Sequence, residues 1–548
     1  MRRASILFAT VCLLASLVAS TAEGAARQRP ARTVARGNAQ IRSRSIDGIG
    51  TAVRRPLSNF VASSIDCTAT TAPGATNTQL DCDSELPNNE PDIVVDPEDP
   101  LHMIASSNDY DQCCDAFYTT FNGGQTWTVG NMSNEGVKRT GSDPVTVIDP
   151  KSGNAIHSSL NYRFTPQGES TDGDLVVSIS TDGGITWGEP VVVSDGEGAD
   201  SAPLQIFNDK EWMVTDTDPG SAFYGRTYLT WTRFVSRNGH YKKSPIWESH
   251  SDDGGLTWTP EQEISGSAAF CTFQEAGAAG VCDENQFSVP ATAPDGTVYV
   301  AFENGQNTAA WETGHEVESS YLVVRSTDGG VTWGAPVNAA DLEDGKHDLP
   351  MSVGARQTVN GYQLRLNSAG NIVVGSTGTL YIVFADNRAG THDVADPITD
   401  LNIYLVMSTD GGVTWSAPTA VDAGPSDQWF PWAAINPVNG QLGVIYNDRD
   451  ATNPDLYNAG YAVGSPGSFT LSTVSANPSD PTNSLFFQTN APGCKKCAAF
   501  NGDYLGLDFG SDGHANLVWT DMSVLTDTFD GSPLPHPRTL QFIFFARV

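Results

Sequence analysis

The sequence has no apolar run long enough to cross a membrane. The stretch from Ile6 to Ala19 follows Arg2 and Arg3 and precedes small residues up to Ala26. It is shorter than the roughly 20 residues that a membrane helix needs, and its flanks are typical of a secretory signal. We therefore expect residues 1–26 to be a signal peptide, and a secreted, extracellular protein without membrane insertion.

Positive charge is also scarce. The chain has 30 Lys and Arg against 64 Asp and Glu, and eight arginines lie between Arg27 and Arg55. Residues 56–548 hold 20 basic and 62 acidic side chains and so carry a net charge of −42. Such a body repels polyanions, so we expect no nucleic-acid partner, and we interpret the acidity chiefly as a solubility feature. Residues 27–60 are predicted to form an arginine-rich, disordered leader.

Several familiar catalytic patterns are missing. The sequence contains no HExxH, no paired Cys/His zinc spacing, no phosphate-binding loop and no dinucleotide-binding glycine pattern. Helical periodicity is absent as well. We expect no cofactor and no metal; the oxygen-rich residues 107–112 leave calcium as an alternative, although they do not fit an EF-hand loop.

The cysteines remaining after the signal form an even set, as expected of an exported protein. Local pairing predicts Cys67–Cys82, Cys271–Cys282 and Cys494–Cys497, which leaves Cys113 and Cys114 as a vicinal pair. Sequence alone does not fix this connectivity. The CKKC stretch at 494–497 lacks the βαβ context of a redox motif, so we interpret it as a structural link.

One short pattern occurs five times. The copies are TTFNGGQTW, STDGGITW, SDDGGLTW and two STDGGVTW, and they end at Trp127, Trp187, Trp258, Trp333 and Trp415. The short Asp or Asn side chain can accept backbone N–H groups of its own turn, and the two glycines supply positive φ. The tryptophan then begins the next strand and packs between sheets. The pattern predicts a hairpin turn whose Asp serves the scaffold.

This pattern resembles the Asp-box, also called the bacterial neuraminidase repeat. The resemblance covers most of the chain after about residue 85 and implies an all-β propeller in which each box joins the third and fourth strands of a blade. It says little about function, because sialidases, other glycosidases, polysaccharide lyases and binding proteins share the box.

Short β-branched and aromatic runs separated by turn residues give the blade count. Blade starts are expected near residues 89, 143, 209, 285, 363, 428 and 502. We therefore predict seven blades, with the six of sialidases as the alternative. The segment before Asn89 is expected to supply the fourth strand of the last blade and close the ring. Residues 61–548 would form one domain, and we expect a monomer.

Strand direction predicts where chemistry lies. If the boxes lie at one end of the ring, the first strand of each blade starts at the other end, and the second strand of each blade ends there. Long polar loops follow several of these strands, as at a binding face. The candidate catalytic residues are Tyr504, Asp503, Asp448 and Glu90. The candidate substrate-binding residues are Arg449, Arg388, Arg365, Asp386, Asp209, Lys210, Glu211 and Gln428.

These residue types suit glycan chemistry. Two carboxylates can divide acid and base work, arginines can clamp a carboxylated sugar, and a tyrosine beside an acid can act as the nucleophile, as in sialidases. The sequence departs from sialidases in having NNEPDI where that family has a Phe/Tyr-Arg-Ile-Pro motif. The predicted function is a secreted, sialidase-like exo-glycosidase. The alternative is a non-catalytic propeller that binds glycan or protein at the cell surface, with Asp-Arg pairs serving only to tie blades together.

Overall fold

The computed structural model describes most of the chain from residue 64 to residue 548. The stretches outside the description are 83, 85, 112–114, 134–139, 165–169, 198–203, 239, 273–277, 308–317, 346–347, 351–356, 363, 368–369, 393–397, 485–489, 492–493, 496–499 and 530–531. The expected signal peptide and leader, together with Cys113, Cys114 and Cys497, therefore lie outside the described residues. The described part is all β apart from one short 3-10 turn, η2 (Pro481–Asn483).

No helix in the described ranges is long and apolar enough to cross a membrane.

The strands form antiparallel groups in which neighbours along the chain pair. The first sheet has the order β1-β6-β5-β4-β3 and consists of β1 (Ser64–Thr70), β3 (Asn88–Val95), β4 (Met103–Asp109), β5 (Asp115–Thr120) and β6 (Thr126–Asn131). The second group consists of β7 (Thr140–Ile148), β8 (Ala155–Phe164), β9 (Ser170–Ser180) and β10 (Val191–Ser194). The third consists of β11 (Leu204–Thr215), β12 (Thr227–Arg237), β13 (His240–Lys243), β14 (Ile246–Ser251) and β15 (Gln262–Glu263). A parallel contact of Phe207 with Gly173 joins β11 to β9.

Three further sheets have four strands in simple order. They are β16 (Asn285–Thr292), β17 (Val298–Asn307), β18 (Glu318–Ser326) and β19 (Val337–Asp341); β20 (Ile372–Val374), β21 (Leu380–Asp386), β22 (Asn402–Ser408) and β23 (Thr419–Asp422); and β24 (Gln428–Ile435), β25 (Leu442–Arg449), β26 (Tyr457–Ser465) and β27 (Ser468–Thr473). Two small hairpins pair β28 (Asn490–Ala491) with β29 (Cys494–Lys495) and β32 (Leu525–Phe529) with β33 (Ser532–Thr539).

The last sheet joins the two ends of the described chain. Its order is β2-β34-β31-β30, where β2 (Thr78–Gln79) lies between β1 and β3 in sequence. The other three strands, β30 (Gly506–Phe509), β31 (Ala515–Asp521) and β34 (Phe542–Arg547), come from the C-terminal end of the chain. The prediction that the segment before Asn89 completes this sheet is confirmed by the pairing of Thr78 with Phe545.

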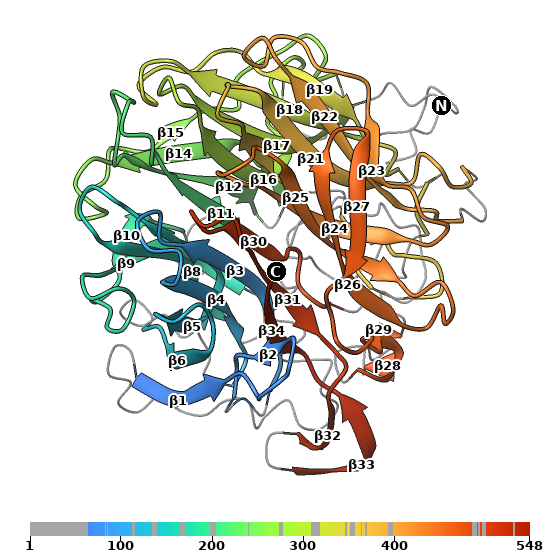
Figure 1. Cartoon of the computed structure of the whole chain (residues 1–548). Coiled ribbons are helices and arrows are strands. Elements are labelled where there is room, and N and C mark those ends of the chain that lie inside the picture. The colour runs from blue at the N-terminus through green and yellow to red at the C-terminus, as the bar shows by residue number, and fades with distance from the viewer. Residues whose placement is uncertain are drawn as a thin grey trace.

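The inner strands of successive sheets contact one another around a common centre. The contacts run from β3 to β7, β11, β16, β20, β24 and β30, and β30 contacts β3 again. Figure 1 shows the sheets fanned in this propeller-like way, with β3, β11, β16 and β30 near the middle. Buried aromatic side chains fill the spaces between sheets, and Trp127, Trp231, Trp429 and Trp519 are among the largest fully buried ones. Burial of this apolar surface is the main force that holds the sheets together.

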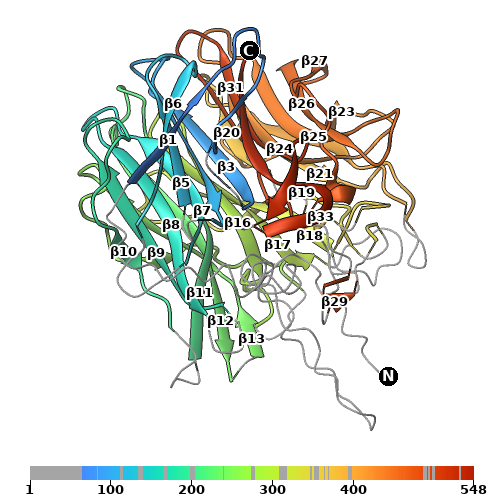
Figure 2. The ribbon, with the colours of Figure 1, turned by 90° about the horizontal axis from the view of Figure 1, so that it is seen from below.

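The strand registers separate the two ends of the ring. Asn89 pairs with Asn108 at one end of the first sheet, whereas Met103 pairs with Thr120 at the other, just before the Gly-Gly turn. We call these the polar end and the turn end. In Figure 2, β13 and β29 lie at the polar end and the C-terminus lies at the turn end. The Gly-Gly turns and the starts of the inner strands therefore lie at opposite ends, as the alternation of strands predicts.

Each Gly-Gly turn is closed by its own side chains. In the turn at 180–187, the Thr186 hydroxyl donates to Asp182 at 2.6 Å, the Thr186 backbone N–H donates to the same carboxylate at 2.9 Å, and Ser180 accepts from Gly184 N–H at 2.8 Å. The first glycine also offers its carbonyl to the preceding sheet. The donors are His102 to Gly183, Asn154 to Gly254, Arg226 to Gly329 and Arg325 to Gly411. These bonds explain why the pattern recurs: four of the five turns fasten two sheets in this way.

Two of the predicted disulfides are present. Cys67 is bonded to Cys82 and Cys271 to Cys282. The first ties β1 to the segment that leads to β3, and the second closes a loop after β15.

Candidate functional site

The inner strands share a backbone distortion near the polar end. Glu90, Asp143, Lys210, Phe287 and Phe430 have φ values of 57°, 59°, 53°, 52° and 55°. Each sits where the register of its strand shifts against the next strand. Positive φ is strained for residues other than glycine, and a bulge turns a side chain away from the regular alternation. The fold thus repeats one strained position around its centre, which is typical of positions that serve a site.

Charged side chains at and beside these bulges form one buried group, which we call the central cluster. Its members are Glu90, Asp143, Asp209, Lys210, Glu211, Arg365 and Asp503, all buried. Their charges act on one another's pKa values, so the seven groups form a single electrostatic unit. Five carboxyl groups therefore share a buried space with two cations.

The Glu90 carboxyl group makes several hydrogen bonds. Its side chain accepts from the backbone N–H of Asp503 at 3.1 Å and from the Asn108 amide at 2.5 Å, and it is hydrogen-bonded to the Asp143 carboxyl. Burial first, and then the charges of Asp143 and Asp503, raise the pKa of Glu90 well above its usual range. Burial also raises the pKa of Asp143. Glu90 and Asp143 therefore share a proton that is held above the usual pH range of a carboxyl group, which suits a general acid.

Lys210 places its ammonium among aromatic rings. Its Nζ lies 3.4 Å from the ring centre of Tyr504, 4.7 Å from Trp212 and 6.0 Å from Phe287. This Nζ has no hydrogen-bond partner among the described residues. Burial lowers the pKa of Lys210, although the carboxylates of the cluster oppose that shift. Cation–π attraction is the main contact that the ammonium makes here.

Arg365 pairs with Asp503 across the ring. The Arg365 Nε donates to Asp503 at 3.1 Å, Nη2 contacts the second carboxylate oxygen, and each side chain is 4 % exposed. The guanidinium also lies over Phe500, 4.3 Å from the ring centre. Burial opposes the charge of Arg365, but Asp503 and Glu90 raise its pKa. A forked pair of this kind is both strong and directional.

The carboxyl groups of Asp209 and Glu211 have oxygen atoms without hydrogen-bond partners. The Oδ1 atom of Asp209 and both carboxylate oxygens of Glu211 lack a hydrogen-bond partner within the described part of the chain. Burial, followed by the charge of Asp143, raises the pKa of both groups well above its usual range. The cluster is therefore short of positive charge.

The space left within the cluster is small. A cavity of about 10 Å³ is lined by Asp143, Asp209, Lys210, Thr232, Phe234, Gln286, Phe287 and Asp503. That volume is about the space for one water molecule. Its lining combines the aromatic rings of Phe234 and Phe287 with three carboxyl groups and the ammonium group of Lys210.

Tyr504 contacts Lys210, which lines this cavity, and is 3 % exposed. Its hydroxyl donates to the carbonyl of Pro144 at 3.4 Å, and its ring packs edge-on to Trp212. Burial raises the pKa of Tyr504 well above its usual range. A raised pKa disfavours the phenolate form, in which a tyrosine is most nucleophilic. This environment favours a role for Tyr504 in supporting Lys210.

The other predicted site residues make contacts apart from the central cluster. Arg388 pairs with Asp386 at 2.6 Å, Gln428 donates to Asp448 at 3.3 Å, and Arg449 pairs with Asp427 at 2.5 Å. Burial raises the pKa of Asp448 to about 6. None of the hydrogen bonds or ion pairs of these residues with other described residues reaches the central cluster. The three arginines Arg365, Arg388 and Arg449 thus each hold a different carboxylate and do not converge on one ligand group.

Sequence reasoning missed Asp143 as a site residue. It occupies the position in β7 that Glu90 occupies in β3, and both precede a proline, as Phe430 does. Aligning the inner strands on the residue that precedes the proline would have identified Asp143. Glu303 was also missed: it is 1 % exposed, pairs in register with Gln286, and burial raises its pKa to about 7.

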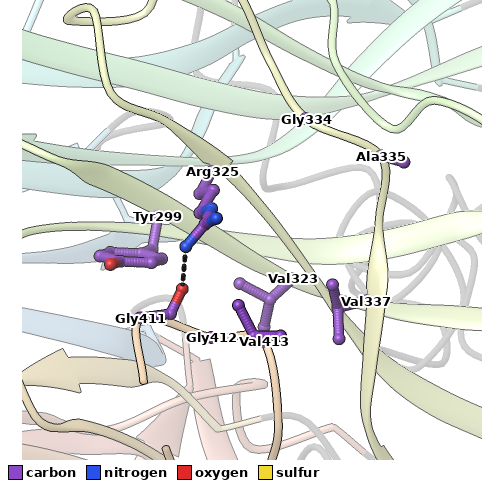
Figure 3. A pocket seen from close by; sticks show the side chains of 9 residues that line it. All are labelled: Tyr299, Val323, Arg325, Gly334, Ala335, Val337, Gly411, Gly412 and Val413. Carbon is purple, nitrogen blue, oxygen red and sulfur yellow. Dashed lines mark hydrogen bonds between the residues drawn. The ribbon is translucent and has the colours of Figure 1, made fainter. Parts of the chain in front are cut away.

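A larger cavity lies at the turn end and has a different character. It measures about 190 Å³ and is lined by Tyr299, Val323, Arg325, Gly334, Ala335, Val337, Gly411, Gly412 and Val413. Figure 3 shows that the Arg325 guanidinium points across it to the Gly411 carbonyl, at 2.6 Å. Its lining is mostly valine, alanine and glycine, and its one charged group is used as a fastening between sheets. It therefore offers little for chemistry.

Comparison with known proteins gives a short match in sequence. No family model matches the chain. The chain is 32% identical over 143 residues to a sialidase from Micromonospora viridifaciens, and the match covers 22% of each protein. The chain thus spans about a fifth of the length of this curated relative.

Several solved structures resemble the chain at low identity. A protein of unknown function from Dyadobacter fermentans is 12% identical, with a TM-score of 0.43 and coverage of 74% of this chain and 94% of that one. A sialidase from Streptococcus pneumoniae is 10% identical, with a TM-score of 0.42 and coverage of 82% and 83%. An α-L-arabinofuranosidase of Fusarium graminearum is 12% identical, with a TM-score of 0.42 and coverage of 73% and 96%.

Proposed function

We propose that the protein is a seven-bladed, carbohydrate-active propeller that hydrolyses glycosidic bonds at its central cluster. The blade count is supported by the strand groups headed by β3, β7, β11, β16, β20, β24 and β30, whose inner strands contact in turn. The disulfides Cys67–Cys82 and Cys271–Cys282 suit an oxidising compartment, so the proposal places the protein outside the cell.

The observation that carries this proposal is the contrast between two carboxyl groups in one buried site. Glu90 shares a proton with Asp143, whereas Asp503 is neutralised by Arg365. Glycoside hydrolysis uses such a division, because one carboxyl group protonates the leaving oxygen and the other acts as base or nucleophile. Glu90 is the proposed acid and Asp503 the proposed second carboxylate.

The rest of the cluster has supporting roles in this proposal. The aromatic wall formed by Phe234 and Phe287 would receive the apolar face of a sugar ring, while Asp209 and Gln286 would contact its hydroxyl groups. Polar residues near the ends of neighbouring strands would contact parts of the glycan farther from the scissile bond. They are Arg388, Asp386, Gln428, Asp448 and Arg449. The resemblance to sialidases and the short match to one of them support a glycan substrate.

A second function is favoured by the size of the cavity. Space for about one water molecule does not admit a sugar ring without movement of Lys210. A non-catalytic propeller that binds glycan or protein at the cell surface would need no such opening.

The test is a panel of aryl glycosides, including an aryl sialoside, assayed with the whole protein and with Glu90→Gln and Asp503→Asn. We expect turnover of at least one member and a loss of about a hundredfold or more in each variant, because acid–base groups contribute that much. Asp527→Asn, in the exposed hairpin β32–β33, is the matched control and should keep full activity. Absence of turnover on every member, or turnover that both variants retain, would contradict the hydrolase proposal.

A further inference from the structure

We propose that the central cluster recognises a positively charged amine, and that its glycan is an amino sugar with a free amine and not a carboxylated sugar. This inference rests on the proposed function for the glycan, but the charge of the ligand follows from the cluster itself. Three features of the cluster favour an amine: the balance of charge, an unpartnered carboxylate oxygen on the cavity wall, and the aromatic rings around Lys210.

The charge balance of the cluster disfavours an anion. Five carboxyl groups face Lys210 and Arg365, and Arg365 is already held by Asp503. The net charge of the remainder of the chain is strongly negative as well, so its field draws cations toward a polar pit and repels anions. A sugar carboxylate would add a negative group to a cluster that already holds five carboxyl groups, without a free arginine to clamp it.

One wall of the cavity offers an unused acceptor. Asp209 lines the cavity, is 3 % exposed, and its Oδ1 atom has no hydrogen-bond partner among the described residues. A buried carboxylate oxygen without a donor is costly. An ammonium group supplies three N–H donors and a positive charge, so it satisfies this atom in a way that a hydroxyl group alone does not.

The protein already holds one ammonium in this place. Lys210 sits among the rings of Tyr504, Trp212 and Phe287, in an arrangement like the aromatic cages that bind ammonium ligands. Because the cavity beside Lys210 holds only about one water molecule, a ligand amine must displace the lysine side chain. Lys210 therefore acts as an internal stand-in for the amine, and the two compete for the same rings and carboxylates.

Calorimetry with small probes tests this inference independently of turnover. D-glucosamine should bind, while N-acetyl-D-glucosamine and D-glucuronate should bind at least about tenfold more weakly, the loss expected when one charge-assisted hydrogen bond is removed. Binding of the amine favours the ionised carboxyl groups, so protons should be released, and the measured heat should vary with the ionisation enthalpy of the buffer.

Two variants separate an amine site from an anion site. Asp209→Asn should weaken glucosamine binding about tenfold while Asp527→Asn leaves it unchanged. Lys210→Met should strengthen glucosamine binding, because it removes the competing ammonium and a like charge. If Lys210→Met instead abolishes binding of glucuronate that the native protein shows, the cluster is an anion site and the inference is wrong. Thermal unfolding of each variant verifies that it is folded.

The outcomes distinguish this inference from the hydrolase proposal. Glucosamine binding without turnover of any aryl glycoside would refute the hydrolase and support the amine site. Hydrolysis of neutral aryl glycosides, with glucosamine bound no better than its acetylated form, would refute the amine site and leave the hydrolase intact.

Discussion

Gly502 lies directly against Glu90, and only a glycine leaves room for the Glu90 main chain and side chain. A Cβ atom at Gly502 would lie 2.9 Å from the backbone nitrogen of Glu90 and 3.1 Å from its Cγ. Gly502 also has a φ of +94°, a conformation that other residues rarely adopt. The segment just before the last inner strand, β30, thus makes space for the proposed acid, which belongs to the first inner strand, β3.

Gly502→Ala should therefore damage both stability and the site. The left-handed backbone and the forced contact together should lower the free energy of unfolding by about 2–4 kcal/mol. Gly378→Ala is the matched control, because Gly378 has a φ of +79° and nothing within 4 Å of its added Cβ. It should lose only about 1 kcal/mol. Urea unfolding measures both values, and equal losses would show that Gly502 and Glu90 are not crowded.

Arg365 and Asp503 form a buried pair whose separation should be costly. Arg365→Met leaves the Asp503 charge uncompensated and should lower the free energy of unfolding by about 3–5 kcal/mol. The double variant Arg365→Met/Asp503→Asn should recover much of that loss, because no lone charge remains. Chemical denaturation of the native protein, both single variants and the double variant gives the coupling energy. A coupling near zero would mean that the two groups do not interact in solution.

The sequence predicted the scaffold well because the scaffold repeats. The Gly-Gly turns need an Asp or Asn, two glycines and a threonine at fixed spacing, and each side chain makes the bond that the spacing predicts, as Thr186 does to Asp182. Turns that depend on neighbouring residues in this way can be predicted from a single sequence. The opposite placement of the turns and the inner-strand starts then followed from the alternation of strands.

The site was only partly predictable, because its members come together through the ring closure. Glu90 and Asp503 are 413 residues apart and meet only where the last sheet contacts the first. Polar residues at strand ends could be listed, but the sequence did not reveal that Arg449 pairs with Asp427 while Arg365 reaches the centre. It also did not reveal that burial would raise the pKa of Tyr504.

Asp410 should titrate in an unusually acidic range. The Thr414 hydroxyl donates to its carboxylate at 2.6 Å and the Thr414 N–H at 2.9 Å, and these bonds lower the pKa of Asp410 to about 2. A folded pKa below the unfolded value of about 3.9 contributes stability above pH 4 that is lost as the pH falls toward 2. Carboxyl carbon shifts measured by NMR against pH should show this value.

Thr414→Val tests the cause of that shift. Loss of the hydroxyl donor should move the pKa of Asp410 upward, while Asp328 in the equivalent turn should keep its pKa of about 2 and serves as the internal control. If both aspartates titrate as before, the threonine hydroxyl does not stabilise the charged form.

Glu90 should make the free energy of unfolding depend on pH. Because burial and the charges of Asp143 and Asp503 raise its folded pKa, the folded state binds a proton that the unfolded chain loses near its ordinary pKa of about 4.3. The unfolded state then holds fewer protons, so this group makes the free energy of unfolding fall as the pH rises from about 4 toward the raised pKa. Glu90→Gln removes that fall. Its stability relative to the native protein should increase from pH 4 to pH 8 in urea unfolding, while hydrolysis is lost.

Asp508→Asn separates the stability effect from the catalytic one. Burial raises the pKa of Asp508 to about 6, and its carboxylate accepts from the backbone N–H of Val95 at 2.8 Å, outside the central cluster. This variant should show the same trend in relative stability between about pH 4 and 6, but should keep the native turnover on the aryl glycoside. If Glu90→Gln instead loses stability as the pH rises, Glu90 is ionised in the folded protein and cannot be the stored proton of the site.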